Sequence, residues 1–140
     1  MRVLLADDQV WLRSAMRLLL EQEPNLEVVG EACDTHSLLH ETKAVAPDLI
    51  LLDWELPGLG ALGAHQRFIH SLHTEWPALK IIALSVNSDA KSASLAVGVA
   101  AFVNKAEPPD RLLAALSRIG QTIMHNQKQG YNPDNFGYHP

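Results

Sequence analysis

Residues 47–58, with the sequence PDLILLDWELPG, decide the fold, because an apolar run here ends abruptly in the carboxylate of Asp53 and a proline–glycine turn. Leu49 to Leu52 has no polar residue on either alternating face, which is typical of a parallel strand buried on both sides. Such a strand delivers Asp53 to its carboxyl end. Placing a carboxylate there costs free energy through desolvation, so we expect a cation, a hydrogen-bond network or a chemical role to compensate.

Four other short apolar runs predict further strands, and helical patterns lie between them. These strand runs are residues 3–6, 26–30, 79–84 and 100–103. Apolar residues recur at helical spacing in segments 12–20, 38–46, 62–72, 89–97 and 112–123. We expect Asp34 to cap the second helix and Ser88 the fourth, whose alanine-rich side should pack weakly. The alternation predicts an α/β fold, a doubly wound five-stranded parallel sheet between helices on both faces. We take the strand order as 2-1-3-4-5, one of the common orders of such sheets, in which the first and third strands are neighbours.

Polar side chains follow the strands where they end. Asp7 and Asp8 follow the first strand, Asp53 the third, Ser85 the fourth and Lys105 the fifth. Because the carboxyl ends of parallel strands share one edge, we expect all five to meet there. Three crowded carboxylates repel one another, and hard oxygen ligands favour Mg²⁺ as the neutralising cation. With the lysine and the hydroxyl, this edge is suited to binding a phosphoryl group.

These segments resemble the receiver domain of two-component response regulators over about residues 1–123. The resemblance rests on LLADDQ (4–9), LLDWELPG (51–58), ALS (83–85) and FVNKA (102–106). DDQVWLR (7–13) and the rather apolar last helix are most similar to receivers of LuxR/NarL-type transcription regulators. The resemblance implies a flavodoxin-like receiver domain over residues 1–124, with residues 125–140 as a flexible C-terminal tail or linker remnant.

The resemblance also implies roles for individual residues. Asp53 is the expected phosphoacceptor, and Asp7 and Asp8, together with Asp53 and the backbone carbonyl of Glu55, are the expected Mg²⁺ ligands. Lys105 and Ser85 are expected to contact the phosphoryl group. Ser85 is also expected to act as a switch together with the aromatic residue Phe102.

Two features depart from the family pattern. Ala106 stands where the family usually has a proline after the lysine, often with a cis peptide bond. Because a cis bond before a non-proline residue costs about 2.5–4 kcal/mol, we expect a trans bond here. The loop PGLGALGAH (57–65) replaces the more usual path into the third helix, so the resemblance does not define its geometry.

The expected partner is a sensor histidine kinase or a phosphotransfer protein. Homodimerisation on phosphorylation is a further partner hypothesis, compatible with the first. A formal net charge of −5 and the absence of a basic run argue against direct binding of nucleic acid or an acidic membrane surface. A single cysteine, Cys33, excludes an internal disulfide, and the short apolar start is unlike a signal peptide. We therefore expect a cytoplasmic protein.

Two other functional classes are compatible with parts of the sequence. Asp53-Trp54-Glu55 superficially resembles the nucleophile and acid of haloacid-dehalogenase phosphatases, which also form an aspartyl phosphate. That alternative leaves Asp7 and Asp8 without a role. A flavin-binding module is less consistent, because acids follow the first strand where a phosphate-binding loop would offer amides and hydroxyls. The favoured prediction is a phosphorylation-activated switch that is not an enzyme beyond its own phosphorylation and dephosphorylation.

Overall fold

The computed structural model describes residues 1–130, although for residues 128–130 it defines the helical backbone alone. Strands and helices alternate along the described chain, as the sequence predicts. The strands are β1 (Arg2–Ala6), β2 (Glu27–Ala32), β3 (Leu49–Asp53), β4 (Lys80–Ser85) and β5 (Ala101–Asn104). The helices are α1 (Val10–Glu21), α2 (Thr35–Val45), α3 (Ala64–Glu75), α4 (Ala90–Ala96) and α5 (Pro109–Gly130).

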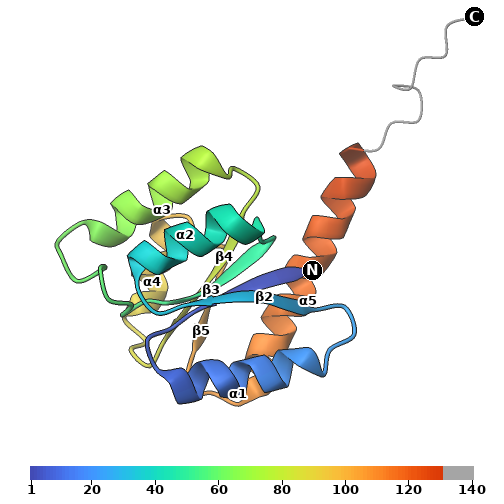
Figure 1. Cartoon of the computed structure of the whole chain (residues 1–140), viewed down its shortest axis with the longest axis horizontal. Coiled ribbons are helices and arrows are strands. Elements are labelled where there is room, and N and C mark those ends of the chain that lie inside the picture. Colours follow the sequence, from blue (N-terminus) through green and yellow to red (C-terminus); the bar gives the residue numbers. More distant parts are fainter. Residues whose placement is uncertain (131–140) are drawn as a thin grey trace, which may run out of the picture.

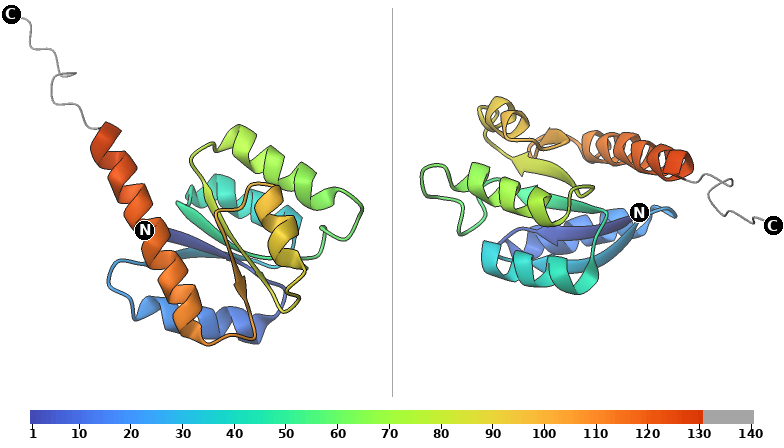
Figure 2. Two further views of the ribbon diagram at one scale, coloured as in Figure 1. Left: turned by 180° about the vertical axis from the view of Figure 1, so that it is seen from behind. Right: turned by 90° about the horizontal axis from the view of Figure 1, so that it is seen from above.

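The strands form one parallel sheet in the order β2-β1-β3-β4-β5, which confirms the predicted topology. Helices α1 and α5 cover one face, while α2, α3 and α4 cover the other (Figures 1 and 2). The chain steps from β1 outward to β2 on one side and from β3 outward to β4 and β5 on the other, so the strand order reverses between β1 and β3. In open parallel sheets this switch point forms a crevice at the carboxyl ends of the strands.

Strand β3 is the centre of the sheet, and all five of its residues are buried. Leu49 and Leu51 pack into the core beneath α1 and α5, whereas Ile50 and Leu52 pack beneath α2 and α3. A strand with two buried faces has no place for a polar side chain except at its end. The apolar run before Asp53 therefore has the physical origin that the sequence predicts.

The caps of α2 and α4 differ in how well the sequence predicts them. Asp34 caps α2 as expected, since its carboxylate accepts the Ser37 N–H at 2.7 Å in a reciprocal capping box. The prediction that Ser88 caps α4 is wrong. Within the described residues no side chain caps α4, and the Asn87 side chain accepts the N–H of Asp89, the residue directly before the helix, at 3.0 Å. Only two residues of α4 are buried, in agreement with the predicted weak packing.

In the loop between β3 and α3, the structure differs from the helical pattern that the sequence predicts. Leu62 is 99% exposed and lies before α3, so its predicted place on the buried helical face is wrong. Gly63 has a φ of 74° and redirects the chain before Ala64, and Leu59 fills the core instead. Gly58 lies against Thr35, where an added Cβ would come within 2.1 Å of the Thr35 hydroxyl oxygen. This close approach requires glycine and fixes the loop to the start of α2.

Helix α5 continues to Gly130, six residues beyond the predicted domain limit at residue 124. Ile123 is the last of its predicted apolar series and still packs on the core, after which the helix leaves the sheet (Figure 1). Residues 131–140, which make up most of the predicted tail, lie outside the described residues. No helix within residues 1–130 is long and apolar enough to cross a bilayer.

We predict that the stability of the domain depends on β3 much more than on the exposed loop leucine. Leu51→Ala should lower the free energy of unfolding by about 3 kcal/mol, because it leaves a cavity in a fully buried strand. The matched change Leu62→Ala should alter it by less than about 0.5 kcal/mol. Urea unfolding followed by circular dichroism measures both, and equal effects would contradict this account of the core.

Candidate functional site

Three carboxylates meet at the carboxyl ends of β1 and β3. Ala6 pairs with Leu52 in the sheet, so the residues that follow each of them, Asp7 and Asp53, become neighbours across the switch point. Asp7 is fully buried and Asp53 is 3% exposed, whereas Asp8 is exposed. Oxygens from Asp7, Asp8 and Asp53 all lie within 4.8 Å of one another. The structure thus brings together the three acids that the sequence predicts.

Lys105 lies between two of these acids. Its Nζ is 2.7 Å from Asp7 Oδ2 and 3.1 Å from Asp53 Oδ1. The Lys105 backbone N–H donates to the Ser85 carbonyl at 2.9 Å, which holds the lysine at the end of β5 beside β4. Burial lowers the pKa of the ammonium, but hydrogen bonds and charge attraction from Asp7 and Asp53 raise it by more. Lys105 therefore stays protonated and neutralises part of the acidic cluster.

Asp53 is the strongly perturbed acid of the site. Burial raises its pKa, the Glu55 N–H and Lys105 oppose this by stabilising the charged form, and the charge of Asp7 raises the pKa further, to about 6. Both opposing contacts, at 3.1 Å each, are to Oδ1. Oδ2 accepts no hydrogen bond from any residue in the described part of the chain. The site thus holds an incompletely stabilised carboxylate with one oxygen available for bonding.

The turn that follows β1 is held by a residue that sequence reasoning missed. Gln9 N–H donates to Asp7 Oδ1 at 2.9 Å, and Arg13 Nη1 donates to the Asp7 carbonyl at 2.6 Å. Arg13 also pairs with Glu31 of β2 at 3.3 Å. Its position in the first turn of α1 directs the side chain back over the preceding turn, and this helical geometry was the available signal.

Ser85 also lies at this edge, where it is fully buried. Its hydroxyl donates to Glu55 Oε1 at 2.5 Å and accepts the Asn87 N–H at 3.0 Å. The hydrogen bond between the Glu55 side chain and Ser85 was not predicted, because the resemblance implicates only the Glu55 backbone carbonyl as a ligand. The role of that carbonyl as a Mg²⁺ ligand stays a prediction.

Phe102 does not join the acids. It is half-buried on β5, where it packs against the core beneath α2, α3 and α4. Its predicted switch role therefore stays a prediction. Trp54, which follows Asp53, stacks on His65 with ring centroids 3.9 Å apart, and His65 Nε2 lies 2.6 Å from the Trp54 carbonyl oxygen. This pair fixes the chain directly after Asp53 against the start of α3.

The donor set fits a hard divalent cation. Asp7, Asp8 and Asp53 offer only carboxylate oxygens, and two of the three residues are buried with too little positive charge beside them. One lysine pairs with two of the three carboxylates, and burial, together with the charge of Asp7, keeps the pKa of Asp53 raised. Oxygen ligands with this excess of negative charge suit Mg²⁺. The peptide bond before Ala106 is trans, as the cost of a cis bond predicts.

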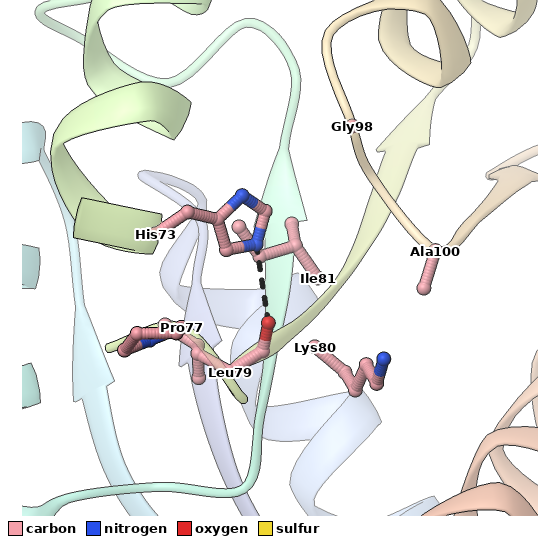
Figure 3. A pocket seen from close by; sticks show the side chains of 7 residues that line it. All are labelled: His73, Pro77, Leu79, Lys80, Ile81, Gly98 and Ala100. Atoms are coloured by element: carbon pink, nitrogen blue, oxygen red, sulfur yellow. Dashed lines mark hydrogen bonds between the residues drawn. The ribbon is translucent and has the colours of Figure 1, made fainter. Parts of the chain in front are cut away.

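A separate pocket of about 240 Å³ lies at the opposite, amino-terminal end of β4 and β5 (Figure 3). His73 Nε2 lies 3.2 Å from the Leu79 carbonyl oxygen on one side, and Gly98 and Ala100 approach from the other. None of the site residues that the sequence predicts lines this pocket. This pocket is therefore separate from the acidic edge.

Comparison with known proteins identifies the family. The family model described as response regulator receiver domain matches residues 3–117. The chain belongs to this family. It is a receiver domain of two-component response regulators, and the match spans all of the site residues described above. The resemblance inferred from the strand-end motifs is thereby confirmed.

The individual proteins to which the chain is similar are response regulators. The chain is 29% identical over 119 residues to the response regulator UvrY of Escherichia coli, covering 84% of this chain and 53% of UvrY. It matches RcsB of Salmonella enterica serovar Typhimurium, bound to promoter rprA with the phosphomimetic BeF3−, at a TM-score of 0.77 and 28% identity, covering 86% and 60% of the two chains. A LuxR-family response regulator from Aurantimonas matches at a TM-score of 0.73 and 27% identity, covering 84% and 83%.

These matches agree with the predicted similarity to LuxR-type receivers. The chain spans about half the length of UvrY.

We predict that neutralising Asp53 stabilises the metal-free domain. Its pKa of about 6 in the folded state lies above the unfolded value of about 3.9, so the folded protein binds the proton more tightly. Stability should therefore fall as the pH rises from about 4 to 6 and stay lower above that range. At pH 7 with EDTA, Asp53→Asn should raise the free energy of unfolding by about 2 kcal/mol and remove this part of the pH dependence.

Urea unfolding between pH 4 and 8 measures this effect, with Asp8→Asn as the matched control. Asp8 is exposed, so its neutralisation should change stability much less. An Asp53→Asn protein with the same stability and the same pH slope as the wild type would contradict the proposed cost of the buried charge.

Proposed function

We propose that Asp53 accepts a phosphoryl group and that this modification is the signal of the domain. The observation that carries the proposal is the buried Asp53 carboxylate, with Oδ1 held by Glu55 N–H and Lys105 and with Oδ2 free of hydrogen bonds. Oδ2 attacks the phosphorus atom, and the bond from phosphorus to a phosphohistidine nitrogen breaks. The nitrogen takes the electron pair, and Asp53 becomes an acyl phosphate.

The residues around Asp53 supply what such a transfer requires. Phosphoryl transfer depends mainly on positioning and on neutralising the charge of the phosphoryl oxygens. Asp7, Asp8 and Asp53, with the Glu55 backbone carbonyl, would hold Mg²⁺, which neutralises phosphoryl charge when bound. Lys105 supplies a fixed positive charge within 3.1 Å of Asp53. The Ser85 hydroxyl supplies a hydrogen-bond donor from the adjacent strand.

The phosphorylated state differs from the free state in charge and in hydrogen-bond demand. A phosphoryl group adds about −1.5 to −2 charge and three acceptor oxygens, which attract Ser85 and Lys105. Ser85 Oγ accepts the Asn87 N–H, and the Asn87 side chain accepts the Asp89 N–H before α4. Movement of Ser85 is therefore transmitted directly to α4, whose packing is weak. We propose that Phe102, on the neighbouring strand β5, turns inward as this region closes.

The proposed partner is a sensor histidine kinase or a phosphotransfer protein. Val10 and Trp11 lie directly after the acidic turn and are 64% and 69% exposed. Large exposed apolar side chains beside a reactive site suit a protein partner that brings its phosphohistidine to Asp53. Homodimerisation on phosphorylation is a further part of the proposal, and light scattering with and without beryllofluoride tests it.

We place the domain in a DNA-binding transcription regulator in which residues 125–140 serve as a linker. The similarity to UvrY and to DNA-bound RcsB supports this, as does the departure of α5 from the sheet. The chain itself has no role in binding nucleic acid or membrane under this proposal, and its location is cytoplasmic. It acts on no separate substrate, so its only chemistry is the gain and loss of its own phosphoryl group. The haloacid-dehalogenase alternative receives no support from family membership.

We predict that phosphoramidate adds one phosphoryl group to the chain, as measured by intact-protein mass spectrometry. The gain should require Mg²⁺ and should be lost in Asp53→Asn, because the nucleophilic oxygen is absent. Lys105→Met should slow the gain by more than about tenfold, since it removes the fixed positive charge from the site. Asp48→Asn, at the opposite end of β3, serves as the matched control and should react like the wild type. Phosphorylation of Asp53→Asn at the wild-type rate would exclude Asp53 as the acceptor.

A further inference from the structure

The side chain of Glu55 makes a contact that phosphoryl transfer to Asp53 does not require. Although Glu55 is exposed, its Oε1 lies 2.5 Å from the fully buried hydroxyl of Ser85. A carboxylate accepts hydrogen bonds, so Ser85 is the donor in this pair. The same hydroxyl accepts the Asn87 N–H at 3.0 Å. In the unphosphorylated protein the single hydrogen of Ser85 is therefore committed to Glu55.

Phosphorylation of Asp53 creates a second demand on this hydrogen. Phosphoryl oxygens are acceptors, and the nearby Ser85 hydroxyl can donate to only one strong acceptor at a time. Glu55 cannot leave the site as a whole, because its backbone N–H is bonded to Asp53 Oδ1 at 3.1 Å. The Glu55 carboxylate and a phosphoryl group on Asp53 thus compete for the same donor.

We propose that Glu55 is a positioning residue that holds the Ser85 hydroxyl in the unphosphorylated arrangement and opposes closure of the site. The inference rests on the proposed function of Asp53 and adds a residue that controls its switching. Closure exchanges one charge-assisted hydrogen bond for another, so the net gain from capturing the phosphoryl group is reduced. The closed state forms only when the hydrogen bond between Glu55 and Ser85 breaks, so this state is less populated. Ligands that bind only the closed state therefore have a lower apparent affinity.

The charge of Glu55 provides a different route to the same result, because a carboxylate also repels phosphoryl oxygens. The two effects differ in what they need. The competition for a hydrogen requires the Ser85 hydroxyl, whereas repulsion between charges does not. Substitution of Ser85 therefore separates them, and glutamine at position 55 retains an acceptor oxygen without the charge.

The test is a titration of the full chain with beryllofluoride, a phosphomimetic, at saturating Mg²⁺, with tryptophan fluorescence as the signal. Glu55→Ala should bind beryllofluoride about tenfold more tightly than the wild type, because Ser85 is released. Glu55→Gln should stay within about threefold of the wild type, since its amide oxygen still accepts the hydroxyl. In a Ser85→Ala background, Glu55→Ala should change the affinity by less than about twofold.

Equal affinity of the wild type and Glu55→Ala would overturn the inference, as would a tenfold gain that persists in the Ser85→Ala background. The Asn87 amide resonance in the beryllofluoride-free protein gives a second readout. It should shift in Glu55→Ala and stay close to its wild-type position in Glu55→Gln, because it reports the hydrogen bonding of Ser85 Oγ. An unshifted resonance in Glu55→Ala would also overturn the inference.

The titration separates failure of this inference from failure of the proposed function. If the wild type binds beryllofluoride in an Asp53-dependent manner and Glu55→Ala does not differ, only the role of Glu55 is lost. If the wild type does not bind beryllofluoride, the proposed function and the inference fall together.

Discussion

The ammonium group of Lys105, held 2.7 Å from Asp7 and 3.1 Å from Asp53, is the interaction on which the acidic edge depends. Two buried carboxylates side by side repel one another, and neither has water enough to screen its charge. The lysine offsets part of this cost. Burial and the charge of Asp7 still raise the pKa of Asp53. A site in this condition gains stability from any additional cation, which couples metal binding to folding.

The sheet must be rigid at this edge, because the buried acids repel one another and keep their positions only if the backbone holds them. Asp53 ends a strand with no polar side chain on either face, and its register against β1 and β4 is fixed by the core on both sides. A shift of one residue would exchange the two buried faces and move Asp53 away from Asp7 and Lys105. Core packing on both faces of β3 therefore holds the buried acids in place against their mutual repulsion. The movable parts lie outside it, in the Ser85–Asn87 turn and in α4, where only Ala90 and Ser94 are buried.

Patterns that depend on local chemistry were predictable from the sequence. The apolar run before Asp53, the parallel alternation, the acids after β1 and the cap at Asp34 follow from periodicity, burial and backbone hydrogen bonding. The predicted burial of Leu62 is wrong because helical spacing in the sequence extends to residue 62, whereas Gly63 turns the backbone before α3 begins. The cap of α4 was assigned to Ser88 because the sequence cannot show that the Asn87 side chain reaches the Asp89 N–H first. Helix α5 outlasts its apolar pattern because polar residues continue a helix that is already nucleated and packed.

By itself, the sequence determined the fold class, the strand order and the set of groups at the carboxyl edge, because a polar residue marks the end of four of the five strands. Only the tertiary structure decided how those groups are shared. It places Lys105 between Asp7 and Asp53, leaves Asp8 exposed, and sets Arg13 against the Asp7 carbonyl. It also joins Glu55 to Ser85 across 30 residues of chain. Hydrogen bonds between side chains from different strands depend on distances of tenths of an ångström, and no periodicity in a sequence encodes such distances.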